Sequence, residues 1–375
     1  LVDNILKQQR TTRYRQDLDL RTLIRVLDGF PLALEVVLAN LTRQTPTQVL
    51  EALQAGDVNL DKSDAQDKTE SILRCIDYSH SNLSPEAQQL LICLALFTSV
   101  INKNLLDQYT AQLKQQPILS TLPFDRWPEV IQEAGNWGLL SPDPDIPNFL
   151  RLQPIFPYFL RNRLGNPAQT EMRLAVETAF CQHYDWLGKG LYDLLESKDP
   201  QKRQVGQLLT RFEYENLLTA LNLALVAQAS IHNPYFALSC YLNTLLQDQR
   251  RGLELGHSVL ESLETYPADK LTGQLGFEFA HVIGDLALRQ LKLKQYTKAE
   301  VLFQRILPLL SQLKHVEKEE RGDLQARTYH NLGIVAQEQR QWKQAEQYYR
   351  QALQIKIEYQ DCYAQASTYH ELGIV

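Results

Sequence analysis

The stretch ARTYHNLGIV at residues 326–335 returns almost unchanged as ASTYHELGIV at residues 366–375. The two copies repeat with a period of 40 residues, measured from Gly333 to Gly373. Self-similarity at a fixed period of this order is the sequence signature of repeat architectures, in which each unit packs mainly on its neighbours. The end of the chain therefore predicts a stack of repeated units.

The repeated units also share a spacing of small and apolar residues. Counted from the first of these residues, the others lie 12, 16 and 19 positions later in the chain. An aromatic residue, Trp342 or Tyr296, opens the second helix. Such offsets place a small residue where the two helices of a hairpin touch, with a larger one a turn later. The expected packing residues are Gly333, Ala345, Tyr349 and Ala352 in one unit, Ala287, Ala299, Phe303 and Ile306 in the unit before, and Gly373 in the unit after.

This pattern resembles the tetratricopeptide repeat, a family of stacked helical hairpins. The period of 40 residues implies longer helices than the usual repeat of that family, as in its kinesin-light-chain-like variants. A more degenerate unit is expected through Cys240, Gly252, Gly256 and Val259, which keep the same offsets. The resemblance implies an α-solenoid over residues 236–375.

A helical hairpin cannot bury its own apolar face, so the units stack and leave a concave surface free for a peptide or a protein. Residues of the expected inner helix are candidates for contact with such a partner. The alternative is that aromatic side chains in these helices only pack between repeats. The candidates are His330, Asn331 and Gln337, with Tyr329, Tyr369 and His370 beside them.

Near the N-terminus, Leu18–Leu27 has helical spacing and stops at Asp28-Gly29, and the phrase Gly29-Phe30-Pro31-Leu32-Ala33 opens a second helix. Glycine suits a helix stop and proline suits a first helical turn, so the stretch predicts a tight helical corner. It also resembles the GxPLA motif of the NB-ARC group of STAND nucleotide switches, although Phe30 stands where leucine is commoner. The resemblance implies that Pro31 lies against the adenine of a bound nucleotide.

The next region predicts three helices and a short hairpin. Ser84 and Pro85 form a strong helix start, and helical stretches follow at 105–113 and 127–137. A proline-rich turn at 142–147 then leads into Phe149–Leu152. This order of elements is typical of a winged helix. A helical subdomain, a winged helix and tetratricopeptide repeats follow one another in STAND regulators.

The winged helix of that family often carries a histidine after the hairpin, which contacts the β-phosphate of ADP. Gln153 occupies this place here. A glutamine amide can donate a hydrogen bond but cannot become cationic, so the resemblance leaves ADP locking through Gln153 in doubt.

The sequence lacks the motifs of common catalytic sites. Its Gly188-Lys189 pair has neither the preceding glycine nor the following Ser or Thr of a phosphate-binding loop. The eight histidines are dispersed, and the five cysteines stand singly without metal-ligand spacing. We therefore expect no catalytic residues, no metal and no bound cofactor in these residues, and ADP or ATP only in an intact switch protein.

Charge and hydropathy exclude other classes of function. The 38 basic and 44 acidic residues give a net charge of -6 and no global attraction to nucleic acid or anionic lipid. No apolar run approaches the roughly 18 residues of a membrane span, and no signal segment precedes the first helix. We expect a cytoplasmic protein without membrane or direct nucleic-acid partners, and a fragment, because Val375 interrupts a helical pattern.

These observations predict a mainly α chain with a small β-hairpin. The expected function is that of the C-terminal part of a STAND NTPase signalling switch, whose repeats sense a protein or ligand and which can oligomerise on activation. The alternatives are a transcriptional regulator with a winged helix and tetratricopeptide repeats, or a scaffold that docks an enzyme. The expected regions are a helical subdomain (1–55), a winged-helix domain (71–165), a helical linker (166–235) and a truncated repeat array (236–375).

Overall fold

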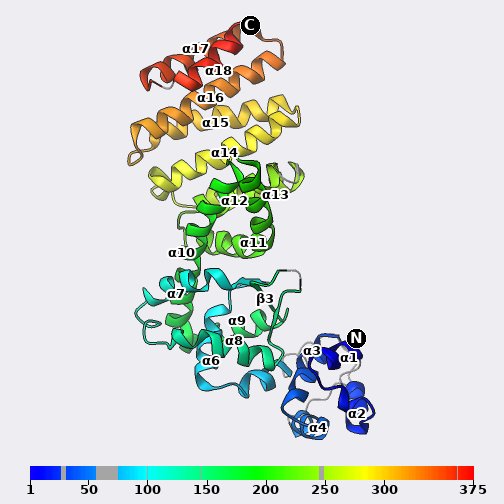
Figure 1. The fold of residues 1–375 in the computed structure, drawn as a ribbon. Coiled ribbons are helices and arrows are strands. Elements are labelled where there is room, and N and C mark those ends of the chain that lie inside the picture. The colour runs from blue at the N-terminus through cyan, green and yellow to red at the C-terminus, as the bar shows by residue number, and fades with distance from the viewer. Residues whose placement is uncertain (27–30, 56–74, 99, 145, 245–248, 361) are drawn as a thin grey trace. The chain divides into compact units, whose positions relative to one another are not determined.

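The computed structural model describes residues 1–26, 31–55, 75–98, 100–144, 146–244, 249–360 and 362–375 (Figure 1). The chain divides into two compact units, Leu1–Tyr184 and Asp185–Val375. Helices dominate both units, and the strands of the described part form one small sheet in the first unit. The expected mainly α fold class is therefore confirmed.

The first part of unit 1 is a group of short helices. Helix α3 is almost wholly apolar, and Val36, Val37 and Leu38 are fully buried in it. Helix α1 packs on α3, and α2 packs on α4. The two helices expected on either side of the Gly29 corner are present, while Gly29 and Phe30 lie outside the described residues. The elements are α1 (Val2–Gln8), η1 (Thr12–Tyr14), α2 (Leu18–Val26), α3 (Pro31–Ala39), η2 (Asn40–Thr42) and α4 (Pro46–Ala55).

The rest of unit 1 combines helices with a three-stranded antiparallel sheet in the order β1-β3-β2. The hairpin of β2 and β3 was expected, but β1 was not, because its three residues carry no alternating pattern of their own. The elements are α6 (Pro85–Leu91), η3 (Ile92–Leu94), β1 (Val100–Asn102), η4 (Lys103–Leu105), α7 (Leu106–Lys114), η5 (Phe124–Arg126), α8 (Trp127–Asn136), β2 (Leu140–Pro142), β3 (Phe149–Leu152), α9 (Phe156–Leu164) and η6 (Pro167–Gln169).

Side-chain hydrogen bonds tie α6, α7 and α8 of this unit together. The Ser84 hydroxyl accepts from the Ala87 amide and so caps α6, and it donates to Glu133 of α8 at 2.7 Å. The Trp127 indole donates to Thr110 of α7 at 2.9 Å. These bonds hold α8 against α6 and α7, and α8 also packs on β2.

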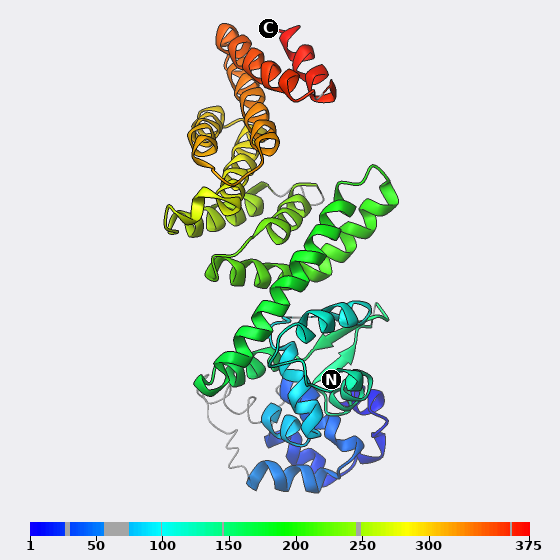
Figure 2. The ribbon, with the colours of Figure 1, turned by 90° about the vertical axis from the view of Figure 1, so that its left-hand side faces the viewer.

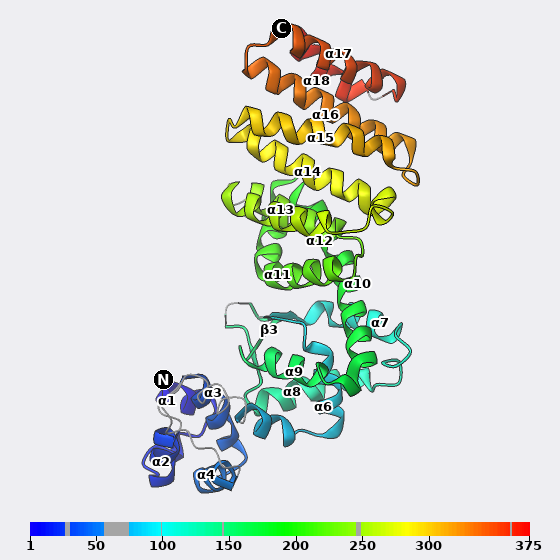
Figure 3. The ribbon, with the colours of Figure 1, turned by 180° about the vertical axis from the view of Figure 1, so that it is seen from behind.

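Unit 2 is a succession of antiparallel helices, and from α11 onward each helix packs on the next (Figures 1 and 3). Figure 2 shows α16 and α17 packed along their length as a hairpin. Tyr296 and Trp342 begin the second helices of their hairpins, as the repeat pattern predicts. The helices are α10 (Thr170–Leu195, which begins in unit 1), α11 (Pro200–Val226), α12 (His232–Thr244), α13 (Gln249–Glu264), η7 (Lys270–Thr272), α14 (Gln274–Lys292), α15 (Tyr296–Gln312), α16 (Lys318–Glu338), α17 (Trp342–Glu358) and α18 (Cys362–Leu372).

The packing residues expected from the repeat spacing are buried, with the exception of Gly373. Gly373 is exposed near the end of the chain. Gly333 is buried against the ring of Tyr349, and in the degenerate unit Gly252 lies against Arg289 and Gly256 against Leu286. The remaining expected residues are fully buried or nearly so: Ala287, Ala299, Phe303, Ile306, Ala345, Tyr349 and Ala352.

The turns between hairpin helices repeat as well. Lys294 and Arg340 have positive φ angles of 57° and 60°, and Gln228 and Gln360 have similar values. After each of the first two, the next amide donates back to a carbonyl in the preceding helix, from Gln295 to Gln290 and from Gln341 to Ala336. A left-handed residue followed by such a bond is a standard way to end a helix.

The boundary of unit 2 differs from the sequence expectation. The region 166–235 was expected to be a linker, but the unit begins at Asp185 within α10, and α11 packs on α12. The expected start of the array at residue 236 falls inside α12. The helices α10 and α11 keep no recognisable repeat spacing, so the sequence pattern did not include them.

Candidate functional site

Unit 2 contains a cavity of about 210 Å³ on the side formed by the first helices of the hairpins. Three consecutive first helices, α12, α14 and α16, each contribute four lining residues at positions i, i+3, i+4 and i+7. This spacing places the four residues of a helix on one face. The lining residues are Phe236, Ser239, Cys240 and Asn243 of α12, His281, Gly284, Asp285 and Leu288 of α14, and Leu324, Arg327, Thr328 and Asn331 of α16.

Further residues complete the lining. Tyr192 of α10 and Glu196, directly after the last residue of that helix, contribute at the end nearest α12. Phe303 and Ile306 of the second helix α15 reach the cavity beside Gly284, where a Cβ atom would lie 3.6 Å from Ile306 Cδ1. Five helices of the unit, α10, α12, α14, α15 and α16, thus contribute to the lining.

One wall of this cavity is aromatic. The ring centroids of Tyr192 and Phe236 are 6.4 Å apart, and those of Phe236 and His281 are 5.7 Å apart. Burial lowers the pKa of His281 to about 3, and the nearby positive charge of Arg327 and the neighbouring His232 add to this effect. His281 is therefore neutral at pH 7 and acts as part of the aromatic wall.

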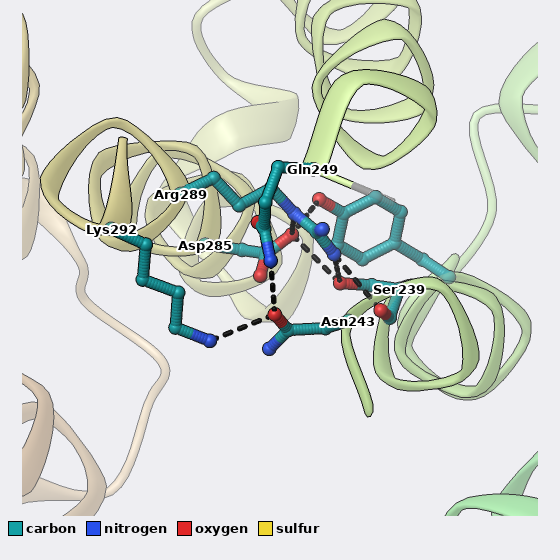
Figure 4. A network of polar contacts seen from close by, with 7 residues as sticks. Ser239, Asn243, Gln249, Asp285, Arg289 and Lys292 are labelled. Atoms are coloured by element: carbon teal, nitrogen blue, oxygen red, sulfur yellow. Dashed lines mark hydrogen bonds and ion pairs between the residues drawn. The ribbon is translucent and has the colours of Figure 1, made fainter. Parts of the chain in front are cut away.

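A buried polar network lies beneath the cavity (Figure 4). The Asp285 carboxylate accepts hydrogen bonds from the Tyr235 hydroxyl (2.9 Å), the Ser239 hydroxyl (2.8 Å) and Arg289 Nε (3.2 Å). Arg289 is only 1% exposed, and its Nη2 donates to the carbonyl and the hydroxyl of Ser239. The charge of Asp285 is therefore balanced by a guanidinium within the protein.

A second group of hydrogen bonds lies at the edge of the cavity. Gln249 of α13 and Lys292 of α14 both donate to Oδ1 of Asn243, at 3.1 and 2.8 Å. These bonds join three helices around one amide (Figure 4). They fix the orientation of the Asn243 side chain at the cavity.

The expected concave-face residues are not all at this cavity. Asn331 lines it. His330 lies 5.5 Å from the ring of Tyr349, and its Nδ1 lies 3.3 Å from the Thr368 hydroxyl, while burial and then Lys356 lower its pKa to about 4. Gln337 accepts a hydrogen bond from the Tyr349 hydroxyl at 2.8 Å. His330 and Gln337 thus contact α17 and α18.

Most of the cavity lining was not anticipated from the sequence. Tyr192 and Glu196 fell in the region expected to be a linker, and the stripes of α12 and α14 contain different residue types from that of α16. The signal that could have found them is the i, i+3, i+4, i+7 spacing of these residues on each first helix. It becomes visible only after the helices are paired into hairpins.

Unit 1 has a larger cavity, of about 630 Å³. Glu35 of α3 lines it, and so does Gln153, whose backbone N–H donates to the Leu139 carbonyl at 3.0 Å. Arg151 also lines it and pairs with the buried Asp143 at 2.6 Å. Pro31 is the first residue of α3, but its side chain lies outside the described residues.

Membrane-spanning helices and metal sites are two further features considered in the described residues. No helix among them has the length and apolar character needed to span a membrane. Within the same residues, no group of three or more His, Cys, Asp or Glu side chains is placed to hold a metal ion.

Comparison with known proteins identifies the end of the chain. A family model described as tetratricopeptide repeat matches residues 324–375, which run from α16 to the C-terminus. No protein with curated annotation matches the chain. Repeats of this kind present extended surfaces for other proteins, so this segment supports the role of a protein-interaction scaffold. Residues 324–375 thus match the tetratricopeptide repeat.

Proposed function

We propose that unit 2 is a protein-binding array and that its cavity receives a segment of a partner protein. The observation that carries this proposal is the same four-residue stripe on α12, α14 and α16, which makes one continuous lining from three hairpins. The lining combines apolar surface with side chains that can bond a peptide backbone, such as Asn331. Clefts of this mixed character are the usual form of binding sites.

A cavity-filling variant tests this function. Gly284 lines the cavity, and a Cβ atom there would meet only Ile306 Cδ1 at 3.6 Å, an ordinary contact. Gly284→Leu should therefore fold and occupy the cavity. Peptides selected from a random display library on residues 1–375 should lose binding to this variant.

The matched control is Gly190→Leu on α10, where a Cβ atom has no neighbour within 4 Å. Selected peptides should bind this control like the parent chain, as measured by fluorescence polarisation. A selection without enriched peptides, or peptides that bind Gly284→Leu unchanged, would overturn the proposed function.

We further propose that this array belongs to a nucleotide-controlled signalling switch of the STAND class. The GxPLA-like phrase at the start of α3 supports it, as does the order α6, β1, α7, α8, β2, β3, which is that of a winged helix. Glu35, one turn after Pro31, and Gln153, at the place of the family histidine, line one cavity. ADP or ATP would bind in the intact protein, on a phosphate-loop domain preceding these residues.

The coding sequence before residue 1 tests the switch assignment directly. A phosphate-loop motif followed by an acidic metal-binding residue is expected there, and purified full-length protein should release ADP or ATP on denaturation. Residues 1–375 alone should hydrolyse neither nucleotide. An upstream region without a phosphate loop would remove the switch assignment and leave the binding array.

A DNA-reading role for the winged helix is less well supported. Its third helix, α8, carries Glu129, and Arg126 just before the helix lies 3.7 Å from this glutamate. Glu133 of the same helix is bonded to Ser84 and so belongs to the packing of the domain. A helix of this charge does not suit the phosphates that line a DNA groove.

A further inference from the structure

We propose that the α10 end of the cavity recognises a basic side chain, lysine or arginine, of the bound partner segment. This inference rests on the proposed binding function of unit 2 and specifies the chemistry of the partner. Tyr192, Glu196 and Phe236 form the recognition corner, a name used below for these three residues.

The charges around the cavity show why this corner is distinctive. Asp285 is balanced by Arg289, which donates to it from within the protein. Arg327 is bonded to Asp323, one turn away on α16, at 2.6 Å. Glu196 accepts a hydrogen bond from the Cys240 thiol at 3.1 Å, and no cation is placed on it among the described residues. The lining therefore carries one uncompensated negative charge, and it lies at Glu196.

The surroundings of Glu196 suit a long cationic side chain. Tyr192 lies four residues before it, in the last turn of α10, and the Glu196 amide donates to the Tyr192 carbonyl at 3.0 Å. The Tyr192 side chain is 37% exposed, and its ring meets that of Phe236 edge to face at 6.4 Å. Burial raises the pKa of Tyr192, and the Glu196 carboxylate raises it further, which places the phenol within electrostatic reach of that charge. The phenol therefore remains neutral. A lysine or arginine can pair with the carboxylate while its charge or stem lies on the aromatic faces.

Arg327 limits where the cation can bind. It lowers the pKa of His281 and acts against the rise at Tyr192, so its positive charge acts in the middle of the cavity and, more weakly than the charge of Glu196, at the Tyr192 phenol. A basic side chain is therefore favoured at the Glu196 end and disfavoured next to Arg327. We expect the bound partner segment also to carry an apolar side chain, which would occupy the space over Leu288, Phe303 and Ile306.

The test uses peptides selected on residues 1–375 and three variants of the protein. The selected sequences are expected to contain a lysine or arginine near an apolar residue. Glu196→Gln keeps an oxygen for the Cys240 thiol but removes the charge, and should weaken binding about three- to fivefold, the effect of one exposed ion pair. The loss should shrink at high salt.

Charge reversal sharpens the result. Glu196→Lys should abolish binding of the basic peptide and restore binding of its Lys→Glu counterpart. The control Glu261→Gln removes the same charge from an exposed site on α13 outside the cavity and should change nothing.

The outcomes separate the two proposals. If selected peptides are acidic or uncharged, or bind Glu196→Gln and Glu196→Lys like the parent, the recognition corner is wrong while the cavity function stands, provided that Gly284→Leu still abolishes binding. If Gly284→Leu has no effect, both proposals fail.

Discussion

The ring of Tyr349 occupies the space in which a side chain at position 333 would begin. A Cβ atom on Gly333 would lie 2.4 Å from Cε1 of Tyr349, closer than packed atoms can approach. The ring is held there by the hydrogen bond from its hydroxyl to Gln337 of the same helix as Gly333. The glycine therefore lets α16 and α17 approach closely, which explains why the repeat pattern has a small residue at this position.

Gly333→Ala should destabilise the array. The alanine methyl group must displace a fully buried ring, and overpacking of this kind costs about 1–3 kcal/mol. The measurement is the midpoint of the urea unfolding of residues 1–375, monitored by circular dichroism.

The control for this prediction is Gly190→Ala, because a Cβ atom at Gly190 has no neighbour within 4 Å. Alanine favours a helix over glycine, so the control should be neutral or slightly stabilising. Equal effects of the two substitutions would show that the close approach at Gly333 has no energetic weight.

A second close approach involves Gly252 of α13 and Arg289 of α14. A Cβ atom on Gly252 would lie within 1.9 Å of Arg289 Nη1. Gly252→Ala should therefore displace the guanidinium and cost about 1–3 kcal/mol. Arg289→Met removes the partner of Asp285 and should cost about 3 kcal/mol, as for other broken buried ion pairs.

The double variant distinguishes contact from two independent effects. With Arg289→Met in place, the alanine at 252 should cost nothing or stabilise slightly, so the two changes should be less than additive by at least about 1 kcal/mol. Thermal or urea unfolding of the four proteins completes the cycle. Additive losses would mean that Gly252 does not accommodate Arg289.

The sequence predicted the C-terminal hairpins well because their packing is local. Ala345, Tyr349 and Ala352 lie on one helix at fixed offsets from Gly333, and the repeat makes these offsets visible twice. The short strand β1 could not be predicted in this way. Its place in the sheet depends on pairing with β3, about 50 residues later in the chain, and local propensity contains little of that information.

The candidate site was predicted less well, for a related reason. Asn331 was found because it belongs to the repeated phrase, whereas Tyr192 and Glu196 lie at the end of α10 and directly after it, where the repeat spacing is absent. His330 and Gln337 belong to the same inner helix as Asn331 but face α17 and α18. A one-residue difference in position rotates a side chain by about 100° around a helix, and a repeat pattern alone does not fix which face remains open.

The buried carboxylate of Glu278 gives a pH-dependent prediction. It accepts from the Ser230 hydroxyl at 2.7 Å and from the Ile231 amide at 2.9 Å, at the start of α12. Burial raises its pKa above the ordinary value of 4.5, although both hydrogen bonds oppose the rise. A raised pKa contributes stability that is fully present below pH 4.5 and lost as pH rises through the folded-state pKa.

The stability of Glu278→Gln relative to the parent should therefore be higher at pH 7 than at pH 4. The glutamine oxygen can accept from the Ile231 amide while its NH2 group donates to the Ser230 hydroxyl, so both contacts remain without the cost of burying a charge. Glu278→Ala leaves the Ile231 amide unpaired and should cost about 1–3 kcal/mol at both pH values. Urea unfolding at pH 4 and 7 measures the difference. A Glu278→Gln variant whose stability relative to the parent is lower at pH 7 than at pH 4 would contradict this prediction.

The turn between α16 and α17 offers a stabilising substitution. Arg340 is exposed and adopts a φ of 60°, a left-handed conformation that costs a residue with a Cβ atom roughly 1–2 kcal/mol. Glycine adopts it freely but loses more entropy on folding, which offsets about 0.5–1 kcal/mol of the gain. Arg340→Gly should therefore stabilise the array by about 0.5–1 kcal/mol relative to Arg340→Ala, which removes the same side chain but keeps the Cβ atom. Both variants preserve the bond from the Gln341 amide to the Ala336 carbonyl. Calorimetric melting of the two proteins decides the point, because equal midpoints would mean that the left-handed turn carries no strain.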